Sequence, residues 1–221
     1  MMEIPHKQIK SYVLRQGRLT KAQQNALDNY WQEHGLEAGE AALDFNNLFK
    51  NNAPVVLEIG FGNGDSLVEQ AKDNPDKNYI GIEVHTPGVG HCLHRIHQEG
   101  LSNLKVMRHD ATLVLSLQIP DNSLSCVQLF FPDPWHKKRH HKRRILQQSF
   151  IDTIDKKLKQ GGFFHMATDW ENYAEHMRSE MDASMQFCFH SEDRGDRPQT
   201  KFETRGLKLG HRVWDMIYKK I

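Results

Sequence analysis

From residue 54 onward, short apolar runs alternate with longer amphipathic segments, and this alternation limits the possible folds more than any other feature. Seven runs are typical of strands: VVLEI, YIGIEV, LKVMRHD, VQLFF, FFHMAT, QFCFH and VWDMIY. Helical patterns lie between them: one from about Asp65, one through Leu93 and Ile96, one from Arg144 to Lys159 that ends at Gly161 and Gly162, and one from Trp170 to Met181. Repeated strand–helix units predict an α/β fold with a doubly wound, mostly parallel sheet covered by helices on both faces.

The last two predicted strands require a different connection. The segment between Ser191 and Gly210 is short and polar, so it leaves no room for a crossover helix. Parallel neighbours need such a crossover, whereas antiparallel neighbours do not. We therefore expect these two strands to form an antiparallel pair at one edge of the sheet.

Residues 1–53 differ from the rest of the chain. They contain one helical pattern, from Leu19 to His34, which Gly35 ends. A chain of 221 residues is long enough for one domain with an appendage, at about 150 residues per domain. The sequence thus predicts an N-terminal extension over residues 1–53 and a single α/β domain over residues 54–221.

Composition excludes several classes of protein. No stretch approaches the roughly 20 apolar residues of a membrane span, and the opening MMEIPHKQIK lacks the apolar region of a signal peptide. Cys92, Cys126 and Cys188 are widely spaced and odd in number, which argues against a disulfide framework and a thiolate zinc site. We expect a cytoplasmic protein without a membrane partner.

A glycine-rich loop follows the first predicted strand of the sheet. Gly60, Gly62 and Gly64 occupy alternate positions just after Glu58, which lies in the end of the strand. Glycine allows positive φ and lets a ligand approach the backbone closely. Because α/β folds bind nucleotides at the carboxyl ends of their strands, the loop is a candidate cofactor site.

Two further carboxylates end the next two predicted strands. Glu83 lies 19 residues beyond Gly64, where an acidic side chain can accept both hydroxyls of a ribose, and Asp110 ends the third strand. Together with the loop they favour a nucleoside-containing cofactor. A nicotinamide-dependent oxidoreductase stays an alternative, because a glycine loop and an acidic residue partly fit that class too.

The fourth predicted strand ends in a stiff turn that is followed by positive charge. Pro132 and Pro134 flank Asp133 and fix the backbone on both sides of its carboxylate. Residues 134–144 then carry six lysine or arginine side chains and three histidines, with no acidic residue. Such a run beside the cofactor crevice is typical of a surface that contacts nucleic-acid phosphates.

At this point the chain resembles a known family, the bacterial tRNA (guanine-N7)-methyltransferases. The motifs that carry the resemblance occur in the family's order: LEIGFGNG, GIEVH with PGVG, HDA, LFFPDPWHKKRHHKRR, HMATDW, TKFE and RGLKLGH. They cover roughly residues 55 to 215. The resemblance implies a seven-stranded methyltransferase sheet with an antiparallel edge strand, S-adenosylmethionine as cofactor, and methylation of guanine N7 in the variable loop of tRNA.

The resemblance also implies roles for individual residues. The cofactor site would comprise Glu58, Gly60, Gly62, Gly64, Glu83, Asp110 and Asp133, with Asp133 also as the catalytic residue. The tRNA would contact Lys137, Arg139, His140, His141, Lys142, Arg143, Arg144, Asp169, Thr200, Lys201, Phe202 and Glu203. Of these, Asp169 and Glu203 are the candidates for accepting hydrogen bonds from N1 and N2 of guanine.

The chemistry of N7 limits what the protein must supply. Guanine N7 carries a lone pair and no hydrogen, so no general base is needed, and a fixed carboxylate can stabilise the cation that forms. We expect Asp133 to act by orientation and electrostatics, although proton transfer stays open. We expect His109, His136 and His165 to be structural or RNA-contacting residues and no metal to bind. A catalytically silent RNA-binding protein on the same fold stays a third hypothesis.

Overall fold

A single sheet of eight described strands organises the molecule. The computed structural model describes residues 10–13, 17–195, 197–199, 203–204, 210 and 212–221. The strand order is β1-β4-β3-β2-β5-β6-β8-β7. The strands are β1 (Gly35–Leu36), β2 (Val55–Ile59), β3 (Asn78–Ile82), β4 (Leu104–Met107), β5 (Leu124–Phe130), β6 (Leu158–Thr168), β7 (Phe187–Ser191) and β8 (Trp214–Lys220). All seven predicted strands are present, and the two-residue β1 is an addition.

The sheet is parallel except where β8 enters it. Strand β8 runs antiparallel to both β6 and β7, whereas the pairs β1–β4, β4–β3, β3–β2, β2–β5 and β5–β6 are parallel. The predicted antiparallel pair at one edge is therefore confirmed. Within that pair β7 forms the edge, and β8 lies between β6 and β7.

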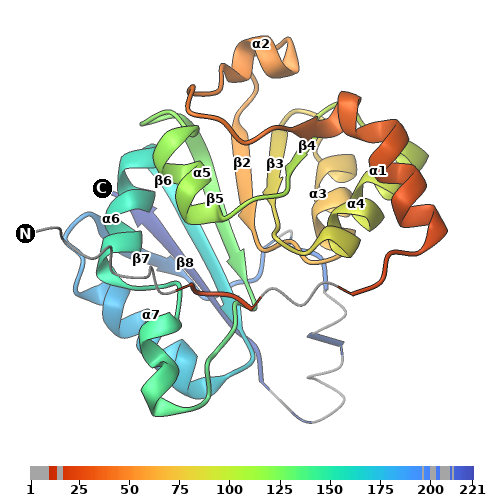
Figure 1. Ribbon diagram of the computed structural model, residues 1–221. Coiled ribbons are helices and arrows are strands. Elements are labelled where there is room, and N and C mark those ends of the chain that lie inside the picture. The colour runs from red at the N-terminus through yellow and green to blue at the C-terminus, as the bar shows by residue number, and fades with distance from the viewer. Residues whose placement is uncertain (1–9, 14–16, 196, 200–202, 205–209, 211) are drawn as a thin grey trace, which may run out of the picture.

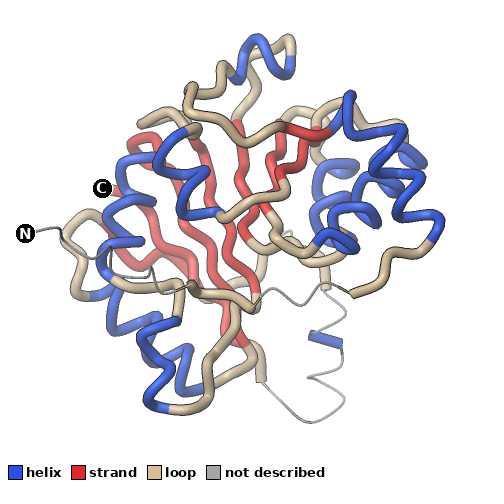
Figure 2. Tube along the Cα trace, viewed as in Figure 1, coloured by secondary structure: helices blue, strands red, loops and turns tan. Residues whose placement is uncertain are grey.

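Helices cover both faces of the sheet, as the strand–helix alternation predicted (Figures 1 and 2). One face carries α1 (Lys21–His34), α3 (Asp65–Asp73) and α4 (Thr86–Glu99). The other carries α5 (Ala111–Leu117), α6 (Gln148–Lys157) and α7 (Glu171–Asp182). The short α2 (Phe45–Phe49) precedes β2. None of the described helices has the length and apolar composition of a membrane span.

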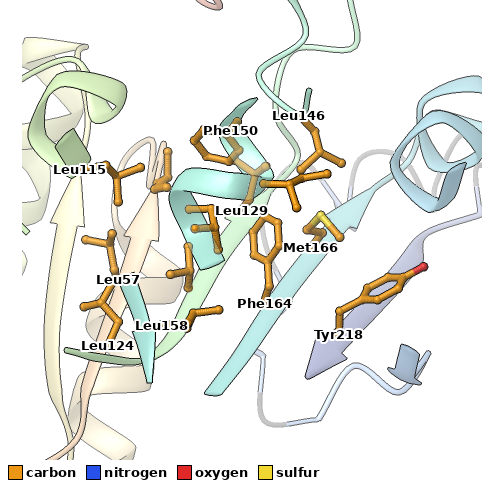
Figure 3. Packing of buried hydrophobic residues seen from close by; sticks show 14 of the residues in the cluster. Leu57, Leu115, Leu124, Leu129, Leu146, Phe150, Leu158, Phe164, Met166 and Tyr218 are labelled. Carbon is orange, nitrogen blue, oxygen red and sulfur yellow. The ribbon is translucent and has the colours of Figure 1, made fainter. Parts of the chain in front are cut away.

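The apolar core forms where α5, α6 and α7 meet the sheet (Figure 3). Because side chains alternate along a strand, Leu57 of β2 points into this core, whereas Val56 and Glu58 point to the opposite face. Leu57, Leu115 and Phe164 are fully buried. This packing fixes the central strands, and with them the edge at which their carboxyl ends meet.

Some predicted helix boundaries were wrong. The helix predicted from Arg144 to Lys159 covers only Gln148–Lys157, and Gly161 and Gly162 lie inside β6. Gly161 has φ 75°, and the register of β5 against β6 shifts between Leu124 and Cys126. These glycines therefore accommodate an irregularity in the strand, which has the same sequence signature as a helix end. The helices α2 and α5 were not predicted.

The described part of the N-terminal extension packs on the sheet domain. Strand β1 pairs with β4, and the ring of Tyr30 in α1 stacks on His97 of α4 at 3.8 Å. A Cβ at Gly90 of α4 would lie 2.8 Å from the carbonyl oxygen of Gln23, so the two helices are in close backbone contact. The division at residue 53 stays a prediction.

Candidate functional site

The glycine loop exposes its backbone at the carboxyl edge of the sheet. Gly60, Gly62 and Gly64 have φ values of 75°, 61° and 77°, which disfavour residues with a Cβ. At Gly60 and Gly62 an added Cβ would meet no atom within 4 Å, whereas at Gly64 it would collide with Cys92. Gly64 is also the N-cap of α3. The first two glycines therefore line open space, and the third permits close packing of α3 on α4.

The two carboxylates predicted at strand ends are held by backbone donors. The N–H of Gly62 donates to Oε2 of Glu83 at 2.8 Å, and Oε1 accepts from Val84 and His85 at 2.7 and 2.9 Å. Oδ1 of Asp110 accepts from the Thr112 N–H at 2.9 Å and caps α5. These bonds fix both side chains before any ligand binds.

A cavity of about 310 Å³ lies between these groups. Its lining includes Gly60, Glu83, Asp110 and Asp133, from the ends of β2, β3, β4 and β5. The structure therefore brings together four of the predicted cofactor residues at the edge of the sheet where α/β folds bind nucleotides.

Glu58 lies beside this cavity without lining it. It is 4% exposed, its Oε2 has no hydrogen-bond partner among the described residues, and burial raises its pKa to about 8. Arg197 opposes this shift and Glu83 adds to it. At neutral pH the side chain therefore holds a proton, and a cation placed near it would favour its ionised form.

The loop that carries Asp133 is strained and clamped from several sides. Phe131 and Trp135 have φ values of 51° and 48°, which cost on the order of 1–3 kcal/mol each for such residues. The N–H of Phe131 donates to the Ala167 carbonyl at 2.8 Å, and Arg144 Nε donates to the Pro134 carbonyl at 3.0 Å. This clamping presents the exposed Asp133 at the mouth of the cavity.

The basic run divides into exposed and structural residues. Residues Lys138–Arg143 form the 3₁₀ helix η1. Lys137, Arg139 and Lys142 are exposed, and none of them forms an ion pair with another described residue. Their side chains are therefore positioned to meet an anionic partner.

Arg143 and Arg144, at the end of the basic run, pack against other parts of the protein. The Arg143 guanidinium lies 4.3 Å from the centre of the Trp135 ring. Arg144 is 3% exposed, donates to Asn172 Oδ1 at 2.7 Å and lies over the ring of Tyr173. The structure therefore places Arg144 as a support of the loop and away from the surface where a phosphate would bind.

The histidines of the run are half-buried. Partial burial, followed by the positive charge of Arg139, lowers the pKa of His140. The pKa of His141 is lowered in the same way by burial and by Arg144. Both shifts favour the neutral form of the imidazole in the free protein.

The predicted guanine-recognition residues lie in different environments. Asp169 follows β6 and is half-buried. Glu203 is 3% exposed, and its Oε2 accepts from Arg194 and Arg197 at 2.8 Å each. Recognition of guanine through both Glu203 oxygens would compete with these ion pairs. Thr200, Lys201 and Phe202 lie outside the described residues.

The histidines considered as metal ligands have other neighbours. His165 Nε2 lies 2.9 Å from Asp215 Oδ1, and its ring meets Phe130 edge-on at 4.9 Å. The ring of His136 packs on Trp170 at 4.2 Å. His109 lines the cavity. The first two thus contribute to packing around the Asp133 loop.

The sequence analysis missed the N-terminal side of the site. Ser11, Tyr12 and Val13 line the cavity, and Trp135 Nε1 donates to the Ser11 carbonyl at 3.1 Å. Burial, followed by the negative charge of Asp110, raises the pKa of Tyr12. The contact between Ser11 and Trp135 could not be predicted from a motif, because residues 124 positions apart in the chain form no local sequence pattern.

Comparison with known proteins adds family information to this geometry. Residues 52–216 match the model of a family described as "Putative methyltransferase". The chain is 56% identical to the tRNA (guanine-N(7)-)-methyltransferase of Escherichia coli strain K12, over 98% of this chain and 93% of that protein. The protein of the same name from strain O157:H7 gives the same values.

Solved structures share the fold at low sequence identity. The 16S rRNA methyltransferase KamB has a TM-score of 0.61 at 14% identity, over 85% of this chain and 97% of that one. A 30S ribosomal A1408 methyltransferase from an uncultured bacterium has a TM-score of 0.54 at 14% identity, over 85% and 98%. The predicted doubly wound methyltransferase sheet is therefore confirmed.

Proposed function

The chain belongs to the family of tRNA (guanine-N(7)-)-methyltransferases, and from this premise we propose how its residues perform the reaction. The protein transfers a methyl group from S-adenosylmethionine to N7 of a guanine in tRNA. Residues 54–221 form the methyltransferase domain. The observation that carries the proposal is the cavity at the carboxyl edge, which Gly60, Glu83, Asp110 and Asp133 share.

The residues around the cavity fit this cofactor. Gly60 and Gly62 border open space that a Cβ would enter, so the backbone there can meet a ligand directly. Glu83 would accept the ribose hydroxyls, and Asp110, which lines the same cavity, would contact the nucleoside part. Glu58, whose buried Oε2 has no hydrogen-bond partner in the described part of the chain, lies beside the cavity and would favour a cationic group there.

When bound, S-adenosylmethionine supplies a methyl group on a positively charged sulfur. The N7 lone pair forms the new bond, the electrons of the broken carbon–sulfur bond stay on sulfur, and no proton leaves the guanine. Asp133 orients the base and stabilises the positive charge that develops on it. Clamping of the Asp133 loop keeps this carboxylate in place without reorganisation during the reaction.

The tRNA lies across the mouth of the cavity. Lys137, Arg139 and Lys142 of the exposed basic surface bind its phosphates, with His140, His141 and Arg143 beside them. Asp169 and Glu203 border the target base, and Thr200, Lys201 and Phe202 contact the tRNA, as the family motif implies. We place that base in the variable loop and the reaction in the cytoplasm, in accordance with the motifs and with a tRNA substrate.

A labelling experiment tests the proposed function. Unmodified tRNA transcript and S-adenosylmethionine with a labelled methyl group are incubated with the protein. The product is reduced with borohydride and then treated with aniline, which together cut the chain at 7-methylguanosine. We expect label in the tRNA and scission at one guanosine. Label without scission would reassign the reacting atom, and tRNA that stays unlabelled would contradict the activity. The family membership opposes the oxidoreductase alternative, and label in the tRNA would exclude a silent RNA-binding protein.

A further inference from the structure

A buried arginine lies beneath the loop that carries Asp133. Arg197 is 3% exposed, and its Nε and Nη2 donate to the two carboxylate oxygens of Asp215 at 2.8 Å each. Its Nη1 donates to Glu203 Oε2 at 2.8 Å. Hydrogen bonds from His165 and Arg197 outweigh the effect of burial and keep the pKa of Asp215 below its ordinary value. The guanidinium is therefore fixed in plane by two carboxylates.

This guanidinium also lies against the start of the loop. Its centre lies 5.3 Å from the centre of the Phe130 ring and 5.5 Å from that of Phe131. Both distances fall within the range of cation–π contacts. The sheet register explains the juxtaposition, because Phe130, Ala167 and Asp215 are neighbours on β5, β6 and β8.

Phe131 is the residue that most needs such support. A bulky residue with positive φ is uncommon and adopts that conformation only where its surroundings enforce it. Its N–H bond to Ala167 fixes the backbone, and the Arg197 contact fixes the ring. Asp133 follows two residues later, so any rotation at Phe131 would displace its carboxylate.

We propose that Arg197 is a positioning residue for methyl transfer. Through its cation–π contacts with Phe130 and Phe131, and while bound to Asp215 and Glu203, it fixes the loop that presents Asp133. Through its bond to Glu203, Arg197 also links that loop to a residue that we place beside the target base. Arg197 contacts neither cofactor nor base in this arrangement, and the inference rests on the proposed function.

The decisive variant is Arg197→Lys, which keeps the charge but loses the planar group. Arg194→Lys is the matched control, since Arg194 shares Glu203 but contacts neither phenylalanine among the described residues. With both substrates saturating, we expect the single-turnover rate to fall at least tenfold in Arg197→Lys and less than twofold in Arg194→Lys. Dissociation constants for S-adenosylmethionine and tRNA should stay within threefold. A full rate in Arg197→Lys, or a loss caused only by weaker binding, would overturn the proposal.

A combined variant tests whether the effect passes through the two aromatic rings. In a Phe130→Leu/Phe131→Leu background both rings are already absent, so Arg197→Lys should reduce the rate by less than twofold further. A full tenfold reduction in that background would mean that Arg197 acts by another route. If Arg197→Lys does not fold, Asp215→Asn tests the same arrangement by releasing the guanidinium. A normal rate in that folded variant would equally refute the proposal.

Loop position can be followed without any catalysis. Protein labelled with 5-fluorotryptophan reports on Trp135 by ¹⁹F NMR, with the resonance assigned from Trp135→Phe. We expect this resonance to shift or broaden in Arg197→Lys and to stay unchanged in Arg194→Lys. An unchanged resonance would refute the positioning role. An inactive wild-type protein that shows the expected NMR difference would instead contradict the proposed function alone.

Discussion

Asp133 lies exposed at the mouth of the cavity, on a loop whose backbone is held from both sides. Replacing it with Asn removes the negative charge and keeps the size of the side chain. Because the charge acts mainly in the transition state, we expect turnover to fall roughly a hundredfold while cofactor affinity stays within about tenfold. Single-turnover methylation and equilibrium binding of S-adenosylmethionine separate the two effects. An unchanged rate would assign Asp133 to structure.

Glu58 gives a prediction about pH. Its pKa of about 8 means that the folded protein holds a proton that the unfolded chain releases near pH 4.5. Stability of the cofactor-free protein therefore falls as the pH rises from about 4.5 to about 8, by at most about 1.4 kcal/mol per pH unit from this group. Urea unfolding at pH 5, 6.5 and 8 should show Glu58→Gln becoming progressively more stable than wild type. A pH-independent difference would contradict the assignment.

The positions of candidate site residues could be predicted only where the sequence places a chemical group at a strand end. Glu83, Asp110 and Asp133 met this condition, and the structure brings them to one cavity. Arg144 looked like its basic neighbours in the sequence, yet it is buried against Tyr173. The charges in the sequence do not show which residue of the basic run is buried, because burial depends on contacts with elements far along the chain, such as α7.

At the scale of elements, the 3₁₀ helix η1 and the residue before it form the exposed basic surface. Replacing Lys137, Arg139 and Lys142 together by Ala should weaken binding to every tRNA. These side chains release counterions from the phosphates and do not distinguish one base from another. The slope of log affinity against log salt should flatten by about one unit for each phosphate that the variant no longer neutralises. Filter binding of tRNA at several salt concentrations measures this slope.

The control for this element is an exposed lysine far from the site. Lys50 is exposed and is the C-cap of α2. Figure 1 shows α2 beyond the amino end of β2, whereas the cavity lies at the carboxyl ends of the strands. Lys50→Ala should leave the salt slope unchanged. An equal change in both variants would show that tRNA binding follows overall charge and that the basic surface has no special role.

The order of elements could be predicted more reliably than their ends. All seven strands were expected because each is a short apolar run. The central strands β2 and β3 are buried throughout, whereas only Phe187 of the edge strand β7 is buried. The end of α6 was missed because Gly161 and Gly162 looked like a helix stop but lie within β6. Strand β1 has only two residues, too few for any periodic pattern.

At the scale of the whole molecule, cofactor binding should raise thermal stability. A ligand that binds only the folded state adds about 2.7 kcal/mol at one hundred times its dissociation constant. For a protein of this size that amounts to a rise in Tm of roughly 5 to 10 °C. We expect this rise with S-adenosylmethionine and none with NADH, measured by differential scanning fluorimetry. Equal rises in Tm with both ligands would contradict a cavity that selects S-adenosylmethionine.

The central claim concerns one atom of the substrate, N7 of the target guanine. A tRNA carrying 7-deazaguanosine at the position identified by aniline scission keeps the Watson–Crick edge of the base and loses only the nucleophile. With labelled S-adenosylmethionine, we predict that this tRNA binds with an affinity close to that of the guanosine form and takes up no label. Incorporation of label at that nucleotide would contradict the account.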